Sequence, residues 1–229
     1  MRKLVLFLFI IISLNIFSQR SNNIGIFAGG SYYLGDMNSS KHFYNLQASA
    51  GLFFRHNLNA RWAYRINLYG GYIGANDADS KYKYQNLRNF SFNTLFIELA
   101  GQMEFNFLPY RLGDEKTPFT PYIALGLGGT YFVNSTKPIQ IIIPISFGIK
   151  FNISEKFGMG IAWNIRKTFT DYIDNLSNYK TLSETEIPEN KYSLKQLGYY
   201  HHTDWYSTIG LFISWKAFNG KGNCKAYHY

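Results

Sequence analysis

The chain has 229 residues, of which 46% are hydrophobic and 19% aromatic, whereas only 16% are charged. Its formal net charge is +9. Few charges and many aromatic residues are atypical of a soluble enzyme and typical of a sheet whose outer face meets lipid. Because the chain has no dense run of Lys and Arg, we expect no nucleic-acid partner and assign the positive charge to attraction toward anionic membrane lipid or an acidic partner.

The N-terminus has the pattern of a secretory signal peptide. Arg2 and Lys3 precede an almost unbroken apolar run from Leu4 to Phe17, and small Ser18 follows. The run is short for a membrane span, and no stop-transfer segment follows it. We predict cleavage near Ser18–Gln19, which removes residues 1–19. The remaining chain, of about 210 residues, suits one domain.

Eight later segments alternate apolar and polar residues with a period of two. Each has at least the roughly 9–11 residues that a tilted membrane strand needs. A closed, even-stranded barrel spans lipid with no unpaired backbone groups. We therefore predict an all-β fold over residues 20–216, an eight-stranded antiparallel transmembrane β-barrel of the outer membrane. The predicted strands are Asn23–Leu34, Phe43–Arg55, Trp62–Gly74, Phe92–Phe107, Phe119–Phe132, Gln140–Phe151, Phe157–Phe169 and Thr203–Trp215.

The lumen of an eight-stranded barrel is filled by side chains. Small Gly, Ala and Ser residues at many inward positions fit this narrow space. A soluble barrel of the lipocalin kind would instead turn its apolar face inward. Aromatic residues at strand ends, such as Trp62 and Trp215, favour the lipid-facing alternative.

The connections alternate in length, which predicts the orientation of the barrel. His56–Arg61, Leu108–Pro118 and Asn152–Lys156 are short, whereas Ala75–Asn89 and Asp171–His202 are long and polar. Barrels of this type place short turns in the periplasm and long loops outside. We therefore expect both termini in the periplasm, with a C-terminal tail at residues 217–229.

Five charged residues occupy positions that the alternation assigns to the lumen. Isolated charges there would be very costly, so we expect them to pair in a structural plug. A glycosidase pair of carboxylates also needs a cleft for sugar, which a narrow, filled barrel does not offer. The residues are Arg65, Glu98, Glu104, Lys150 and Arg166.

The segment "RKTFTDYID" ends in two aspartates, Asp171 and Asp174, where the seventh strand enters the last long loop. His201, His202 and Asp204 lie at the far end of that loop, so a metal or acid–base cluster is one alternative. The favoured interpretation is a polar barrel rim of turn-forming residues. We expect no metal, no cofactor and no small-molecule substrate.

An enzyme acting on outer-membrane lipid is the alternative function. Such an enzyme needs a Ser/His/Asp constellation at the outer rim of the barrel. The residues near that rim that could supply it are His201, His202, Asp204 and Ser207. No histidine of the chain sits in mid-strand beside an outward-facing serine. We therefore expect a protein that is not an enzyme. A small pore is disfavoured by the strand count.

The single cysteine, Cys224, lies in the basic tail between Lys221 and Lys225. One cysteine in an exported chain has no internal partner. Nearby positive charge favours the thiolate. Cys224 is therefore the candidate for an intermolecular disulfide with a periplasmic partner, and the alternative is an inert thiol.

Several stretches, found in the same order along the chain, resemble the PorG family, the outer-membrane barrel component of the type IX secretion system of Bacteroidetes. They follow one another in order from residue 27 to residue 216, along most of the chain after the signal peptide. The stretches are "FAGGSYYLGDMN" (27–38), "FFRHNLNARWAYRINLYGGYIGANDAD" (53–79), "RNFSFNTLFIELAGQMEFNFLPY" (88–110), "FTPYIALGLGGTYF" (119–132), "RKTFTDYIDNLSNYK" (166–180) and "DWYSTIGLFISWK" (204–216).

The resemblance implies a non-enzymatic barrel that ties a periplasmic ring to the outer membrane. The partners would be the ring's lipoprotein and the protein with which it forms the ring. The secretion machine would serve gliding motility, protease export or both. One departure is the short stretch Val133–Pro138, where relatives are expected to carry a longer loop.

Overall fold

The computed structural model describes residues 21–35, 37–38, 41–79, 90–114, 116–133, 135–170, 173 and 204–219. Within these ranges no helix is long and apolar enough to cross a membrane. One 3-10 turn among the described residues, η1, spans Asp77–Asp79. The strands are β1 (Ser21–Leu34), β2 (Gln47–Asn57), β3 (Trp62–Asn76), β4 (Ser91–Asn106), β5 (Phe119–Phe132), β6 (Ile139–Asn152), β7 (Phe157–Thr168) and β8 (Trp205–Asn219).

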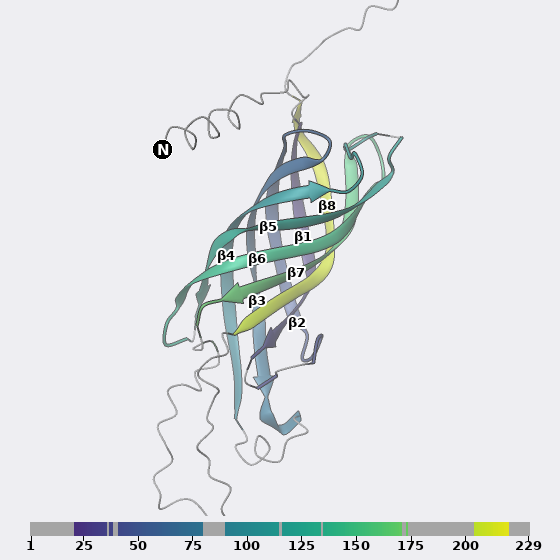
Figure 1. Cartoon of the computed structure of the whole chain (residues 1–229). Coiled ribbons are helices and arrows are strands. Elements are labelled where there is room, and N and C mark those ends of the chain that lie inside the picture. The colour runs from purple at the N-terminus through teal and green to yellow at the C-terminus, as the bar shows by residue number, and fades with distance from the viewer. Residues whose placement is uncertain are drawn as a thin grey trace, which may run out of the picture.

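Each strand pairs antiparallel with the next, and β8 pairs with β1, so the sheet closes into a barrel (Figure 1). The predicted eight-stranded antiparallel fold is confirmed. The turns β2–β3, β4–β5 and β6–β7 lie at one end, called here the short-turn end, at the top of Figure 1. The other end, called the long-loop end, carries the connections 35–46, 77–90, 133–138 and 169–204.

Most strand bounds agree with the prediction to within a few residues, and β5 agrees at both ends. The start of β2 was predicted too early. Phe43 and Asn45 have φ angles of 62° and 48°, in the left-handed region that an extended strand does not use. The strand therefore begins only at Gln47. The end of β8 was predicted too soon, because the strand continues past Trp215 to Asn219.

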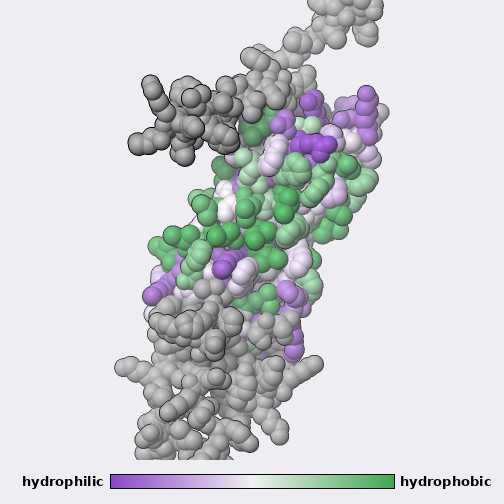
Figure 2. Space-filling view, in the orientation of Figure 1, coloured by the Kyte–Doolittle hydropathy of each residue, from purple (hydrophilic) through white to green (hydrophobic). Residues whose placement is uncertain are grey.

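The outer wall is apolar around the middle of the barrel. Figure 2 shows a hydrophobic band between two hydrophilic ends. Leu99, Leu127 and Ile141 are 60%, 67% and 67% exposed. A water-soluble protein rarely leaves so wide an apolar surface uncovered. The wall instead has the pattern of a barrel that spans a bilayer.

A ring of aromatic side chains marks the wall near the short-turn end. Its members face one another as cross-strand neighbours, for example Trp62 and Phe105, whose ring centroids lie 4.8 Å apart. Aromatic girdles of this kind mark the membrane–water interface. The ring comprises Trp62, Phe105, Phe119, Phe151, Phe157 and Trp215.

Aromatic residues recur farther along two of these strands, at Tyr72 on β3 and Trp205 on β8. Each lies ten positions from Trp62 or Trp215 along its strand. Ten residues at about 3.3 Å each, tilted by about 40°, span about 25 Å of height. That height is close to the apolar band of an outer-membrane barrel.

Aromatic residues also fill the lumen, where the sequence analysis predicted small residues at many inward positions. Four of them lie over a glycine that is their cross-strand partner, and a Cβ on that glycine would collide with the ring. The small inward residues were therefore correctly placed, but they make room for the aromatic rings beside them. The pairs are Gly25 with Phe53, Gly51 with Tyr69, Gly148 with Tyr122 and Gly160 with Phe212.

We expect Gly51→Ala to destabilise the barrel by about 1–3 kcal/mol, because the new methyl group would overlap the ring of Tyr69. Gly101→Ala is the matched control, since nothing lies within 4 Å of a Cβ placed there. Urea unfolding of both variants in lipid vesicles, followed by tryptophan fluorescence, measures the difference. Equal stabilities would show that the lumen tolerates the extra volume.

Candidate functional site in the barrel lumen

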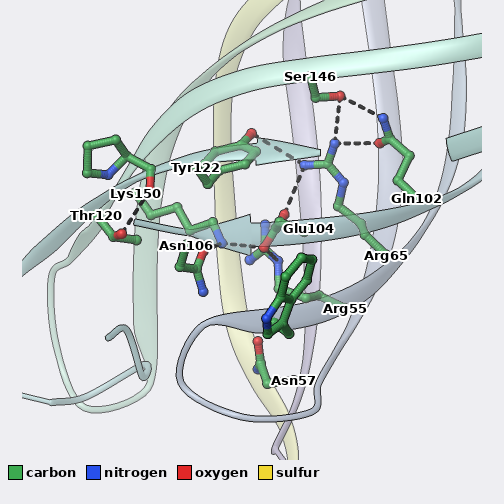
Figure 3. Close-up of polar contacts among 12 residues, drawn as sticks. Arg55, Asn57, Arg65, Gln102, Glu104, Asn106, Thr120, Tyr122, Ser146 and Lys150 are labelled. Carbon is green, nitrogen blue, oxygen red and sulfur yellow. Dashed lines mark hydrogen bonds and ion pairs between the residues drawn. The ribbon is translucent and has the colours of Figure 1, made fainter. Parts of the chain in front are cut away.

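One carboxylate in the lumen, Glu104 on β4, holds three cations. Arg55 Nε on β2 lies 2.9 Å from Oε1, and Arg65 Nη1 on β3 lies 3.4 Å from Oε2. Lys150 on β6 makes both an ion pair and a hydrogen bond with the same carboxylate. All four side chains are at most 2% exposed. Figure 3 shows them converging on Glu104.

Neutral side chains extend this cluster around the lumen. The guanidinium of Arg65 donates to Gln102 Oε1 at 2.6 Å and to Ser146 Oγ at 3.0 Å. Gln102 in turn donates to Ser146 at 2.8 Å. Lys150 also donates to Asn106 Oδ1 at 2.6 Å. The network therefore joins β2, β3, β4 and β6 through side chains as well as through the sheet (Figure 3).

A second carboxylate, Glu98, forms a separate and balanced pair toward the long-loop end. Arg166 Nε on β7 lies 2.8 Å from Glu98 Oε2, and the hydroxyl of Tyr206 donates to the same oxygen at 2.8 Å. Arg166 also donates to Thr208 Oγ1 at 2.6 Å. Glu98 and Arg166 therefore have complementary partners in a region from which solvent is excluded.

Aromatic rings adjoin both ion clusters. Arg65 lies 5.6 Å from the ring centroid of Tyr122, and Arg166 lies 5.5 Å from that of Tyr69. Arg55 lies 5.0 Å from the ring of Phe53. Cation–π attraction of this kind is stronger away from water. The rings thus stabilise the buried cations, which around Glu104 outnumber the carboxylates.

The β4–β5 turn lies over the lumen at the short-turn end. Tyr110 and Leu112 are 5% and 8% exposed there, and Tyr110 N donates to Ala60 O at 2.8 Å. Asn152 Nδ2 ties the turn down by donating to Arg111 O at 2.9 Å. Burial raises the pKa of Tyr110 to about 12, so the phenol stays protonated. A turn predicted simply to be short therefore also covers the barrel.

A hydrophobic cluster fills the long-loop end, with Asp204 beside it. The carboxylate of Asp204 accepts from the Tyr33 hydroxyl at 2.5 Å and from Ile173 N at 3.2 Å. These bonds give Asp204 a structural role at the base of the last loop. The cluster consists of Tyr33, Met37, Ile73, Ala75, Phe96, Phe132, Ile142, Ile173 and Tyr206.

The residues considered for catalysis or metal binding are only partly described. Asp204 is buried and bonded to Tyr33 and Ile173, whereas Ser207, also fully buried, takes an outward position in the alternation of β8, so their side chains point to opposite faces. In the described part of the chain, no group of three or more His, Cys, Asp and Glu residues could hold a metal ion. Asp171, Asp174, His201, His202 and Cys224 lie outside the described residues.

The structure places all five predicted lumen residues, Arg65, Glu98, Glu104, Lys150 and Arg166, in the interior as two clusters. Sequence reasoning left one partner out of the network. That partner is Arg55, the last residue of the second predicted strand, whose contact with Glu104 spans β2 to β4 and depends on the register. The lumen aromatics were also missed, because aromatic residues were attributed to the lipid interface.

No curated protein matches the sequence. Ail of Yersinia pestis, described with the heparin analogue sucrose octasulfate, is 11% identical, with 87% of this chain and 99% of that chain covered and a TM-score of 0.46. Neisserial surface protein A is 8% identical, with 86% and 99% covered and a TM-score of 0.49. OprG of Pseudomonas aeruginosa is 10% identical, with 87% and 99% covered and a TM-score of 0.43.

Structural similarities with TM-scores below 0.5 give no information about what the chain does. The family-level match is more extensive, because it runs along almost the whole sequence. The chain belongs to the family described as "Domain of unknown function (DUF6089)", whose model matches residues 2–226.

Proposed function

We propose that this chain is a non-enzymatic barrel of the outer membrane and a component of the type IX protein secretion system. In this role it ties the periplasmic ring, which contains a lipoprotein, to the membrane. The observation that carries the proposal is the arrangement of the lumen. Its charged groups are bonded to one another, and the described side chains cover it at both ends. Such a barrel acts through its outer surfaces.

The membrane placement is supported by the closed sheet and by its apolar wall. Every strand pairs on both edges, so no backbone edge faces lipid. Short turns at one end match the periplasmic side of bacterial barrels, which supports a periplasmic location for both termini. The connection to the secretion ring rests on the sequence resemblance to the PorG family across residues 27–216.

The contact surface in this proposal is the short-turn end together with the tail. The turns there are held in place by backbone bonds, including Leu58 N to Trp62 O at 2.9 Å and Ile153 N to Phe157 O at 3.0 Å. Such turns offer a preorganised surface to a periplasmic partner. The tail adds Cys224 as a candidate covalent link.

The test is a pull-down of the tagged protein from detergent-solubilised outer membranes, run on gels with and without reductant. We expect a periplasmic lipoprotein to co-purify with the wild-type protein. A high-mass band that collapses on reduction, and that is absent in Cys224→Ser, would make the tail a covalent anchor. Co-purification without that band places the contact on the turns. Recovery of the barrel alone would contradict the proposed role.

Replacing His201 and His202 together by Ala distinguishes the scaffold from a lipid-modifying enzyme. As a scaffold, the variant should secrete cargo at the wild-type level, because neither imidazole has a part in holding a ring. Secretion is measured as cargo protein in the culture medium. Loss of a lipid modification, detected by mass spectrometry of outer-membrane lipid from the variant, would favour the enzyme.

A further inference from the structure

The described outer wall carries one charged side chain at the level of Trp205, the aromatic level nearer the long-loop end. Among the outward strand positions described there, Lys167 is the only Lys, Arg, Asp or Glu. It is half-buried, and its Nζ lies 5.5 Å from the ring centroid of Trp205 on β8. A charge on a lipid-facing wall is costly unless it reaches the interface or finds an opposite charge.

The register places Lys167 at the long-loop end of a set of outward positions across β7, β8 and β1. Lys167 pairs with Trp205, which pairs with Leu34. Two residues closer to the middle of the barrel, the outward positions hold Ile165, Ser207 and Tyr32, of which Ser207 and Tyr32 are fully buried. The next level presents Trp163, Ile209 and Gly30. Adjacent strands are about 4.8 Å apart and levels about 6.6 Å, so the surface is of the size of a lipid headgroup and its first acyl carbons.

Residues 41–46, called here the strap, fold back against this wall. The hydroxyl of Tyr32 lies 3.3 Å from His42 Nδ1 and accepts from Trp163 Nε1 at 3.0 Å. The Phe43 ring lies 5.3 Å from the Tyr32 ring. The strap therefore sets an imidazole and an exposed phenyl ring beside the tryptophan of β7.

The strap holds this position against backbone strain. Phe43 and Asn45 adopt left-handed φ angles, a backbone conformation that is unfavourable for residues other than glycine. Asn45 compensates by donating from Nδ2 to Gly74 O at 3.1 Å. Strain maintained by specific bonds is common at binding sites. Here it fixes His42 and Phe43 on the same wall as Lys167.

We propose that Lys167, Trp205, Trp163, His42 and Phe43 form a binding site for the phosphorylated headgroup of a lipid in the leaflet at the long-loop end. Lys167 supplies the cation for a phosphate, and no acidic side chain occupies the described outward positions to neutralise it. Phe43, 46% exposed, and Trp163 supply apolar contact for the upper acyl chain. The inference rests on the membrane placement proposed above, under which this leaflet is the outer one.

The test is native mass spectrometry of the purified full-length barrel in detergent, titrated with diphosphoryl lipid A. We expect saturable binding of one lipid to the wild type. Lys167→Gln should weaken the affinity for lipid A about fivefold, which is the contribution of one lysine at an anionic membrane surface. Lys167→Arg should retain binding. Lys156→Gln, which removes an exposed lysine at the opposite end, is the matched control and should bind as the wild type.

Three results would overturn the site: equal binding by Lys167→Gln and the wild type, equal binding of lipid A freed of its phosphates, or saturable binding of inorganic phosphate alone. A heat-dependent gel-mobility shift shows that each variant is folded before titration. Because no ring protein is present, failure here leaves the pull-down result standing. Failure of the pull-down in turn leaves this binding measurement valid.

Discussion

Glu104→Gln should destabilise the barrel by about 3–5 kcal/mol, the cost of breaking a buried ion pair by removing one partner. The amide has the same shape as the carboxylate, so packing is conserved. Arg55, Arg65 and Lys150 would then lie in the lumen with no anion among them. Urea unfolding in lipid vesicles, followed by tryptophan fluorescence, measures the loss.

Lys150→Met is the matched control for this prediction. It removes one of the three cations around Glu104, while Arg55 and Arg65 remain paired with the carboxylate. We expect its cost to be smaller than that of Glu104→Gln by at least about 2 kcal/mol, because the loss of an ion pair is offset by relief of repulsion between cations. If Glu104→Gln lies within about 1 kcal/mol of the wild type, the carboxylate does not hold the cluster together.

Leu99→Arg should destabilise the barrel in a bilayer by about 2–4 kcal/mol. Leu99 is 60% exposed near the middle of β4, so its side chain faces the centre of the apolar band. An arginine at the bilayer midplane of a membrane barrel carries a cost of this size, because the charge loses its water. Reversible unfolding from vesicles in urea or guanidinium chloride is the measurement.

Ile139→Arg provides the comparison. Ile139 is even more exposed, at 76%, but it begins β6 at the long-loop end. The cost there should be about 0–1 kcal/mol, because the charge reaches water at the interface. Similar costs at both positions would mean that the wall does not face a bilayer of the expected depth.

The inward and outward assignments along the strands could be predicted from sequence because two environments select side chains at alternate positions. Lipid selects Ile97 and Leu99, and the lumen selects Glu98 between them. The start of β2 was wrong for a related reason. Phe43 and Leu46 continue the apolar pattern in the strap, which lies against the outer wall without extended backbone.

The partners within the lumen could not be predicted, because they depend on how far the strands are staggered. Glu104 meets Arg55 from β2 and Lys150 from β6, although neither strand contains a direct sequence signal for that contact. The aromatic residues of the lumen could not be predicted from their residue type, since phenylalanine and tyrosine suit both the lipid interface and the lumen. Only the register reveals that Gly51 lies beneath Tyr69.

The most direct test of the account is a labelling experiment on intact cells with a membrane-impermeant maleimide, in a Cys224→Ser background. Thr136→Cys lies in the β5–β6 connection at the long-loop end, and Ser154→Cys lies in the β6–β7 turn. A barrel that spans the outer membrane with its termini in the periplasm should label at position 136 in intact cells, and at position 154 only after permeabilisation. The reverse pattern would contradict the orientation, and labelling at both positions only after permeabilisation would contradict the outer-membrane placement.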